Sequence, residues 1–335
     1  MYILGMESSC DETSAAVIEM TQDGKRTICS NIVASQIEIH RLYGGVVPEI
    51  AGRAHIEAIS GITYQALETA GIGIDALGAV AVTSHPGLIG ALLVGVNFAK
   101  SFAFANRIPL VGVNHIKGHV AATYLAHEDL KPPFVATVVS GGHTSIYHVR
   151  DYTDFQEIGA TRDDAAGEAF DKIGRVIGLP YPAGAAMDTL ASQGNPNSIS
   201  LPSPALVGDT LDFSFSGIKT AALNFINNAE QKGETVPRAD LAASYTAKIV
   251  SAITSKTEKA LQKTGLPRLV LAGGVAANTH LRQSLTQMCQ TNGVTMYAPP
   301  ISLCGDNAAM IAAAGYYEFL NGNLADTSLN ASACD

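Results

Sequence analysis

Charged side chains are scarce in this sequence. Lys, Arg, Asp and Glu make up 15% of its 335 residues, whereas hydrophobic residues make up 47%. This composition excludes an intrinsically disordered chain, which would be rich in charge and poor in hydrophobic residues. The length is instead sufficient for two domains of ordinary size. The formal net charge of −9 is not typical of a nucleic-acid-binding surface, so an RNA substrate would require a local basic patch or the help of a partner.

Cysteine is also rare, and its spacing is irregular. The cysteines, which form no C-x-x-C pair, are Cys10, Cys29, Cys289, Cys304 and Cys334. An odd number of scattered cysteines argues against a disulfide framework or a zinc ribbon. It favours reduced thiols in a cytosol.

The N-terminus lacks the features of a signal peptide. It carries Glu7, Asp11 and Glu12 where a signal peptide would have positive charge before a long apolar core. The most apolar region, residues 78–105, is interrupted by polar residues, Pro and Gly. This pattern predicts a buried strand followed by a buried helix, and not a membrane span. We therefore expect a soluble, cytoplasmic protein with no membrane partner.

The two halves of the sequence contain the same motifs in the same order. Residues 2–20 (YILGMESSCDETSAAVIEM) predict an apolar strand, a small polar turn and a second apolar strand, and residues 133–149 (PFVATVVSGGHTSIYHV) repeat that plan. Residues 77–95 and 267–285 each predict a strand, a Gly-containing turn and a helix. This order indicates a duplicated α/β lobe. A chance match between common α/β parts is the alternative.

Two of these turns are suited to phosphate binding. The turn SGGHTS, residues 140–145, exposes backbone N–H groups and hydroxyls with little side-chain bulk. The turn AGGVAAN, residues 272–278, opens a helix whose N-terminus can contact an anion. Each turn alone also fits an ordinary hairpin or close strand–helix packing. Together they favour a nucleotide-binding cleft.

His115 and His119 lie four residues apart in the stretch VNHIKGHVAATYL, residues 113–125. If a helix begins here, both imidazoles lie on one helical face, about one turn apart. They are then either half of a metal site or side chains at a helix start. The spacing alone does not decide, because a metal site also needs a third ligand from elsewhere in the chain.

A series of motifs then runs in order from end to end of the chain: ESSCDETSAAV, YGGVVPEIAGRAH, HIKGH, VVSGGHTS, DDAAGEAFDKIGRVIGLPYPAG, LDFSFSGIKTA, LAGGVAAN and CGDNAAMIAAAG. With them, the sequence resembles the family of tRNA N6-adenosine threonylcarbamoyltransferases of the TsaD type, formerly named O-sialoglycoprotein endopeptidases. The resemblance implies the actin/hexokinase/Hsp70-like (ASKHA) α/β fold, a duplicated two-lobe fold with a five-stranded mixed sheet in each lobe and a nucleotide cleft between the lobes. We expect an N-terminal lobe at residues 1–130, a C-terminal lobe at 131–305, and a C-terminal helix within 306–330 that packs back on the N-terminal lobe.

The resemblance implies transfer of a threonylcarbamoyl group from threonylcarbamoyl-adenylate to N6 of adenosine 37 in tRNAs that read ANN codons, with release of AMP. It also implies one metal ion bound by His115, His119 and Asp306. Two imidazoles and a carboxylate leave coordination positions open, as in catalytic metal sites. This ligand set suits Fe²⁺ or Zn²⁺, and the family implies iron. In its local sequence, Asp306 is instead a candidate N-cap of the Ala-rich helix that follows.

The resemblance places the substrate contacts on a further set of residues. They are Val138, Val139, Ser140, Gly141, Gly142, Asp171, Gly184, Asp188 and Asn278. The polar members each have a structural alternative. Asp171 could pair with Arg175 on an exposed helical face, Asp188 could be a solvated surface charge, and Asn278 could cap the helix that follows it.

Other activities predict different residues. A zincin-type peptidase requires a Glu directly after its first metal-binding His, where this chain has Ile116. A kinase of the same fold could use Asp11 and Glu12, to which the resemblance gives a catalytic role; exposed turn charges are the alternative for this pair. Kinases, however, hold Mg²⁺ through oxygen ligands and need no histidine pair. A nucleotide-binding scaffold without catalysis is a third class.

The resemblance also implies partners. In bacteria this family works with a TsaB-type paralogue and a TsaE-type ATPase, so an RNA-binding surface shared with them would resolve the acidic charge of this chain. Two positions depart from the common family pattern: His85 stands in SHPGL where GPGL is frequent, and Lys117 stands where an acidic residue is frequent. Neither change alters the implied metal ligands or the phosphate turn.

Overall fold

The structure is a computed structural model that describes residues 1–21, 24–204, 206 and 208–334. The chain divides into two compact units. Unit 1 is formed by Met1–Pro132, Arg150–Phe155 and Pro299–Asp335, and unit 2 by Pro133–Val149 and Gln156–Ala298. Each unit therefore contains segments that are distant in the sequence.

Unit 1 is built around a mixed sheet which, in the described part of the chain, has five strands in the order β3-β2-β1-β4-β5. The strands are β1 (Tyr2–Glu7), β2 (Glu12–Met20), β3 (Arg26–Ser35), β4 (Leu77–His85) and β5 (Leu110–Asn114). The helices are α1 (Ile37–Arg41), α2 (Pro48–Ala70), α3 (Ile89–Asn106), α4 (His115–Ala126) and α10 (Ala308–Leu320), with short 3₁₀ turns η1 (Ile74–Ala76) and η3 (Ile301–Leu303). Strand β1 pairs antiparallel with β2 and parallel with β4.

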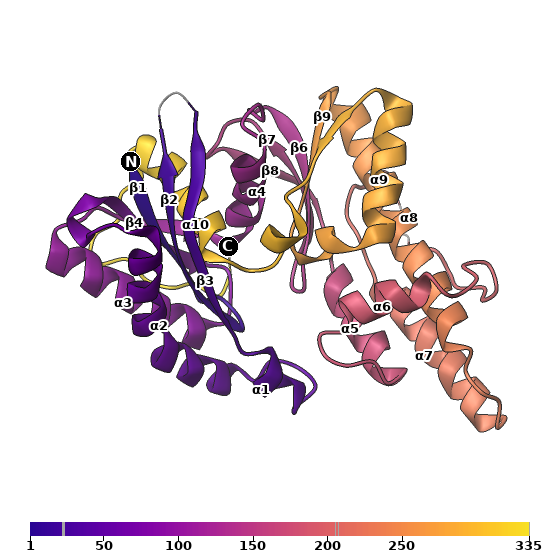
Figure 1. The fold of residues 1–335 in the computed structure, drawn as a ribbon. Coiled ribbons are helices and arrows are strands. Elements are labelled where there is room, and N and C mark those ends of the chain that lie inside the picture. The colour runs from indigo at the N-terminus through magenta and orange to yellow at the C-terminus, as the bar shows by residue number, and fades with distance from the viewer. Residues whose placement is uncertain (22–23, 205, 207, 335) are drawn as a thin grey trace. The chain divides into compact units, whose positions relative to one another are not determined.

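Helices lie on both faces of the sheet of unit 1 (Figure 1), and the residues of β1 alternate between them. Leu4 and Met6 belong to a buried cluster that includes Phe102 of α3. Gly5, between them, faces α10, because a Cβ on Gly5 would clash with the carbonyl oxygen of Ala308. Since successive strand residues point to opposite faces of a sheet, α3 covers one face and α10 covers the other. The small residues of α10 permit this close approach.

Helix α3 is long and apolar enough to cross a membrane by length and composition. In this structure it packs against β4 and α2, and Leu92, Val96 and Ala99 are fully buried in unit 1. Through these contacts α3 belongs to the hydrophobic core of unit 1. The predicted strand followed by a helix in residues 78–105 is confirmed by β4 and α3.

Unit 2 is built around a second sheet, which in the described residues has five strands in the order β10-β9-β6-β7-β8. The strands are β6 (Phe134–Val139), β7 (Thr144–Val149), β8 (Phe155–Ala160), β9 (Arg268–Ala272) and β10 (Thr295–Tyr297). The helices are α5 (Ala166–Val176), α6 (Gly184–Ala191), α7 (Ser216–Gln231), α8 (Arg238–Thr264) and α9 (Thr279–Asn292), with the 3₁₀ turn η2 (Gly274–Ala277).

The two sheets share one topology. In unit 2, β6 pairs antiparallel with β7 and parallel with β9, as β1 pairs with β2 and β4 in unit 1. The strand orders of the two sheets are therefore equivalent, and β4–α3 corresponds to β9–α9. The duplication predicted from the repeated motifs is confirmed, which a chance match of common parts would not produce across both sheets.

Candidate metal centre and phosphate-binding turn

His115 is the first residue of α4, and His119 lies one turn further along. Asn114 caps this helix, because its side-chain oxygen accepts hydrogen bonds from the backbone N–H groups of Ile116 (2.8 Å) and Lys117 (3.1 Å). The two histidine rings are buried and contact each other edge to face, with 4.6 Å between their centroids. The asparagine cap thus places both imidazoles at a fixed helix start.

Asp306, in the turn before α10, meets the two histidines. Its Oδ1 lies 3.5 Å from Nε2 of His115 and 3.3 Å from Nε2 of His119. One donor atom from each of the three residues lies within 4.8 Å of the others. Asn307 caps α10 by accepting a hydrogen bond from the backbone N–H of Met310 at 3.1 Å. The alternative of Asp306 as the N-cap is therefore wrong, and its carboxylate instead points toward the histidines.

The surroundings of His119 fit a bound cation. The side chain is buried, yet among the described residues neither of its ring nitrogens has a hydrogen-bond partner. Leaving a buried polar atom unsatisfied costs about 1–3 kcal/mol, and a metal ion at Nε2 would satisfy one of these atoms. Two imidazole nitrogens and a carboxylate are donors found in catalytic zinc and non-haem iron sites. This cluster could therefore hold one metal ion.

Glu7 contacts His115 at Nδ1, the ring nitrogen that does not face Asp306. Its buried carboxylate was not among the predicted site residues. Glu7, the last residue of β1, is fully buried. Its Oε2 lies 3.0 Å from Nδ1 of His115 and accepts a hydrogen bond from Oγ1 of Thr83 at 2.6 Å. Burial acts to raise the pKa of Glu7, but the charge and hydrogen bond of His115 outweigh it and lower that pKa. The available signal was a lone carboxylate at the end of the apolar strand YILGME.

Asp11 and Glu12 lie where the β1–β2 turn enters β2. The Oε1 atom of Glu12 accepts a hydrogen bond from Oγ of Ser35 at 2.9 Å. Burial, then the negative charge and hydrogen bond of Asp11, then the charge of Asp306 raise the pKa of Glu12 to about 9. These causes favour the protonated form of Glu12 in the metal-free chain.

Residues 138–142 form the end of β6 and its turn into β7. The backbone N–H of Ser140 donates to the carbonyl of His143 at 2.8 Å, and the N–H of His143 donates to Oγ of Ser140 at 3.1 Å. Gly141 and Gly142 are exposed at the tip, and apart from their chain neighbours no heavy atom of the described residues lies within 4 Å of the position that a Cβ would take. The turn therefore presents bare backbone beside open space.

Two further glycines, Gly167 and Gly273, pack against the backbone of Ser140 and Val139 in this turn. Gly167, in the first turn of α5, donates its backbone N–H to the carbonyl of Ser140 at 3.2 Å. Gly273, directly after β9, has φ +92° and lies so close to the carbonyl of Val139 that any Cβ would clash with it. Only glycine fits position 273, for both conformation and space. These contacts hold the turn in place.

The remaining predicted contacts connect α5, α6 and α9 by hydrogen bonds. Asp171 of α5 accepts a hydrogen bond from the backbone N–H of Ala183 at 2.7 Å, directly before α6 begins at Gly184. A Cβ on Gly184 would meet open space. The side chain of Asp171 thus orders the start of α6.

Asp188 of α6 is tied to the start of α9. Its Oδ2 accepts hydrogen bonds from the backbone N–H (3.0 Å) and Oγ1 (2.6 Å) of Thr279, and its Oδ1 lies 2.7 Å from Nδ1 of His280. Burial acts to raise the pKa of Asp188, but these hydrogen bonds outweigh it and lower that pKa. The alternative of a solvated surface charge is therefore wrong.

Asn278 caps α9 by accepting a hydrogen bond from the N–H of Leu281 at 2.9 Å, so its predicted alternative role as a cap is confirmed.

The two departures from the family pattern have local partners. The Nζ of Lys117 donates to Oε1 of Glu318 at 3.1 Å and to the carbonyl of Thr153 at 2.9 Å, which ties α4 to α10. Nδ1 of His85 lies 2.9 Å from Oγ of Ser84. Lys117 thus has a structural role beside the histidine pair.

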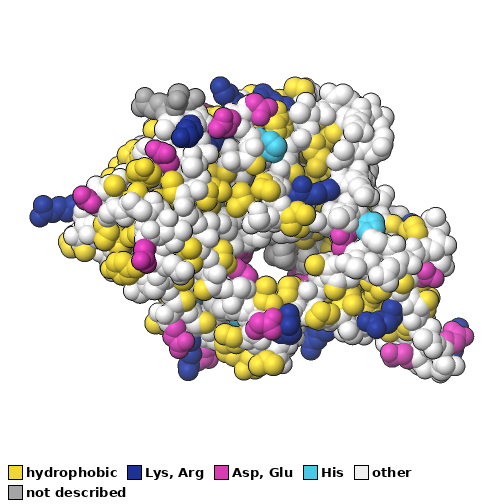
Figure 2. Space-filling view, viewed as in Figure 1, with side chains coloured by type: hydrophobic (Ala, Val, Ile, Leu, Met, Phe, Trp, Pro, Cys, Tyr) yellow, Lys and Arg dark blue, Asp and Glu magenta, His cyan; other side chains and the backbone are white. Residues whose placement is uncertain are grey.

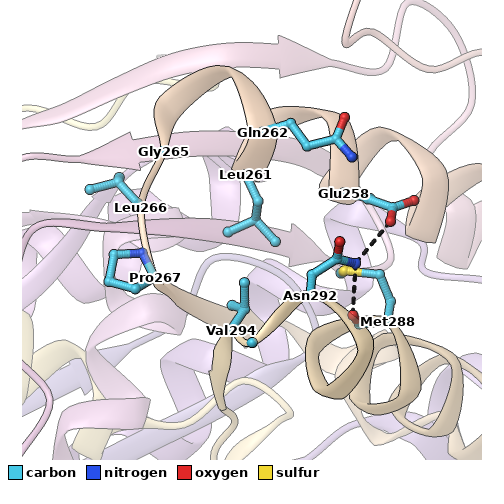
Figure 3. A pocket seen from close by; sticks show the side chains of 10 residues that line it. Glu258, Leu261, Gln262, Gly265, Leu266, Pro267, Met288, Asn292 and Val294 are labelled. Atoms are coloured by element: carbon cyan, nitrogen blue, oxygen red, sulfur yellow. Dashed lines mark hydrogen bonds between the residues drawn. The ribbon is translucent and has the colours of Figure 1, made fainter.

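A pocket of about 290 Å³ in unit 2 contains none of the predicted site residues (Figure 3). It lies at the C-terminal ends of α8 and α9 and at the start of β9. One wall carries a hydrogen bond from Nδ2 of Asn292 to Oε1 of Glu258 at 2.9 Å. We assign this pocket no part in the site.

Several cations that could contact RNA are engaged by acidic neighbours. In unit 2, Lys172 and Lys219 both bind the carboxylate of Asp164, and Arg162 binds that of Asp212. On the face shown in Figure 2, basic and acidic side chains are interspersed. These ion pairs reduce the positive charge available to a phosphate backbone.

The two equivalent sheets define an ASKHA-type α/β protein. The crystal structure of T. kodakarensis HypF matches with a TM-score of 0.63 and 15% identity, over 98% of this chain and 49% of that chain. Component A of the Acidaminococcus fermentans (R)-2-hydroxyglutaryl-CoA dehydratase matches with a TM-score of 0.54 and 16% identity, over 95% and 98% of the two chains. At such low identity the likeness establishes the fold alone, and the predicted fold class is confirmed.

Within this class, the chain belongs to the tRNA N6-adenosine threonylcarbamoyltransferase (TsaD) family, which matches residues 27–313. A relative of that name from Clostridium botulinum (strain 657 / Type Ba4) is 50% identical over 329 residues, 98% of this chain and 96% of the relative. A relative of the same name from Clostridium perfringens (strain ATCC 13124) has the same identity and coverage. The predicted family is confirmed.

Proposed function

We propose that this chain transfers a threonylcarbamoyl group to N6 of an adenosine in tRNA. Membership of the TsaD family along almost the whole chain carries this proposal. In its finer form, the donor is threonylcarbamoyl-adenylate and the acceptor is adenosine 37 of tRNAs that read ANN codons. The C–O bond of the mixed anhydride breaks, a C–N bond forms to N6, N6 loses one proton, and AMP leaves.

His115, His119 and Asp306 would hold one metal ion, for which we propose Fe²⁺, with Zn²⁺ as the alternative. When bound, such an ion supplies Lewis-acid stabilisation of the charge that develops on a carbonyl oxygen. The protein's own contribution is rigid placement of the three donors. Asn114 and Asn307, which cap α4 and α10, fix the two helix starts that carry them.

Unit 2 would bind the nucleotide part of the donor. The bare backbone of residues 138–142 is suited to donating N–H hydrogen bonds to phosphate oxygens. Asp171 would accept hydrogen bonds from ribose hydroxyls, and Asn278 would contact the adenine. Gly184 and Asp188 complete the proposed contacts on α6. The open space beside the glycines of the turn supports this assignment.

Asp11 and Glu12 would serve the proton transfer. The proton that leaves N6 requires an acceptor, which the carboxylate of Asp11 could provide. Glu12, whose pKa is raised by burial and by Asp11, could in its protonated form donate a hydrogen bond to an oxygen that gains negative charge. The pair would thus combine an acceptor and a donor on one turn.

We propose that tRNA binds to a surface shared with a TsaB-type paralogue and with a TsaE-type ATPase, in the cytoplasm. The net charge of −9 and the ion pairs of Lys172, Lys219 and Arg162 support this view, because RNA affinity depends chiefly on free cations near phosphates. The measurement is tRNA affinity with and without the partners at several salt concentrations. Tight, salt-sensitive binding by the isolated chain would refute the shared surface.

The transferase activity is tested by incubating the protein with its partners, threonylcarbamoyl-adenylate, divalent metal and unmodified tRNA, followed by nucleoside analysis. We expect threonylcarbamoyladenosine in the complete mixture and none without this chain. Its absence from the complete mixture would contradict the proposal. A kinase would instead transfer phosphate, and His115→Ala would leave that activity unchanged.

A further inference from the structure

The ring of His115 lies between two carboxylates that approach different nitrogens. Nε2 faces Asp306, with 3.5 Å between Nε2 and Oδ1. Nδ1 faces Glu7, with 3.0 Å between Nδ1 and Oε2. Glu7 is fully buried, although a buried carboxylate is costly unless it is hydrogen-bonded. Its placement therefore needs an explanation.

Both oxygens of Glu7 are held by donors. Oε1 accepts a hydrogen bond from the backbone N–H of Ser9 at 2.5 Å, and Oε2 accepts one from Oγ1 of Thr83 at 2.6 Å. The backbone N–H can only donate, so it fixes which oxygen is turned toward it. The other oxygen is then left facing Nδ1 of His115. The carboxylate cannot rotate without breaking one of these bonds.

This arrangement selects one tautomer of His115. The hydroxyl of Ser9, 3.2 Å from Nδ1, can donate or accept a hydrogen bond, whereas an ionised carboxylate only accepts. The contact with Glu7 therefore requires that Nδ1 carry the hydrogen between them. A neutral ring with its hydrogen on Nδ1 has a bare lone pair on Nε2, the nitrogen that faces Asp306. A metal ion requires such a bare nitrogen, and metal-binding histidines commonly donate their other N–H to a carboxylate.

We propose that Glu7 is a positioning residue of the metal centre, which holds His115 in the orientation and tautomer that leave Nε2 available to a metal ion. This inference rests on the proposed metal site. Glu7 does not itself contact the metal or the substrate. Its effect is on metal affinity, and only through metal affinity on catalysis.

The substitution Glu7→Gln tests this directly. The backbone N–H of Ser9 must still meet an acceptor, so the amide oxygen would occupy that position. The amide NH₂ group would then face Nδ1 of His115 and donate to it. The ring hydrogen would be displaced to Nε2, which weakens metal binding because that hydrogen must then be removed. The second variant, Glu7→Asp, keeps the negative charge but is one methylene too short to make the same contact.

The matched control is Glu318→Gln. Glu318 is also a buried carboxylate of unit 1, and its hydrogen bonds to Lys117 and Asn323 hold α10. The same chemical change is made there, at a carboxylate whose hydrogen-bond partners, Lys117 and Asn323, are not proposed metal ligands. We expect this control to lower the thermal midpoint of the metal-free protein and to leave metal affinity unchanged.

The experiment measures the affinity of the full chain for Co²⁺ and Zn²⁺ by competition with a chromophoric chelator, together with the Co²⁺ absorption spectrum and the metal-free thermal midpoint. We expect both Glu7 variants to lose about 10- to 100-fold in affinity, with a changed Co²⁺ spectrum. Affinity equal to wild type in Glu7→Gln, or in Glu7→Asp should the first variant not fold, would overturn the inference. Failure of the wild-type chain to bind either metal would instead refute the proposed metal site.

Discussion

Asp188 and Thr279 are joined by two hydrogen bonds that end on a single carboxylate oxygen. The backbone N–H and the hydroxyl of Thr279 both donate to Oδ2 of Asp188. The bond from the backbone N–H satisfies one of the groups that a helix N-terminus leaves without an intrahelical partner. Asp188 of α6 therefore helps to fix the start of α9, directly after its cap Asn278.

Removing this carboxylate should loosen the start of α9. We expect Asp188→Ala to lower the free energy of unfolding by about 1–3 kcal/mol, to accelerate hydrogen exchange at the backbone N–H of Thr279, and to weaken AMP binding. Asp188→Asn retains an oxygen acceptor for Thr279 and should preserve the slow exchange. Exchange in Asp188→Ala as slow as in wild type would contradict this account of the helix start.

His119 should stabilise the metal-bound protein and destabilise the metal-free protein. Neither ring nitrogen makes a hydrogen bond within the described residues, although Nε2 lies 3.3 Å from Oδ1 of Asp306. His119→Leu should therefore raise the metal-free free energy of unfolding by about 1–3 kcal/mol. The same variant should lose the stabilisation by metal, which for the wild type is about 2.7 kcal/mol at 100 times the dissociation constant. Urea unfolding with and without Zn²⁺ measures both effects. A variant that zinc stabilises as much as it does the wild type would show that His119 is not a ligand.

Two glycines of unit 2 should respond oppositely to the same change. Gly141→Ala places a methyl group in open space, so stability should change little while AMP affinity falls, because the methyl group occupies space beside the proposed phosphate site. Gly273→Ala meets the carbonyl of Val139 at φ +92°, and should lose at least about 1–3 kcal/mol of stability. Thermal unfolding and AMP titration of both variants measure this contrast. Full AMP affinity in Gly141→Ala would argue against phosphate binding at this turn.

Glu12 should make the metal-free protein less stable as the pH rises. The folded chain holds this proton up to a pKa of about 9, whereas the ordinary value is 4.5. Between these values the folded state binds more protons than the unfolded state, so stability falls with increasing pH. The contribution is fully present below pH 4.5 and is lost as the pH rises through about 9. Glu12→Gln should flatten this part of the profile in urea unfolding between pH 5 and pH 9, and an unchanged slope would contradict the raised pKa.

Much of the fold was predictable because local patterns of apolar and turn-forming residues specify it. The two hairpins and the two strand–turn–helix segments have apolar runs separated by Gly-rich turns, and these became equivalent strands of two sheets. The spacing of His115 and His119 placed both on one face only on the condition that a helix begins there, and α4 meets that condition. By contrast, the cap at Asn307 and the contacts of Asp188 could not be predicted from the sequence. Each depends on a partner or a backbone angle that no local pattern specifies.

Glu7 shows most clearly what the sequence could not provide. As a carboxylate next to a polar turn, it looks like a residue at the exposed end of a strand. Its contact with Nδ1 of His115 arises only because β1 and β4 are neighbours and α4 begins where β5 ends. The sequence contains the residues of the centre, and the order of strands in the sheet brings them together.

We propose above all that tRNA modification by this chain depends on the cluster of His115, His119 and Asp306. The most direct test removes metal from the wild-type chain with a chelator, restores Fe²⁺ or Zn²⁺, and measures threonylcarbamoyladenosine in tRNA beside the His119→Leu variant. We expect product only with the wild-type chain and restored metal. Product formed at the wild-type rate by His119→Leu, or by the wild-type chain without metal, would contradict it.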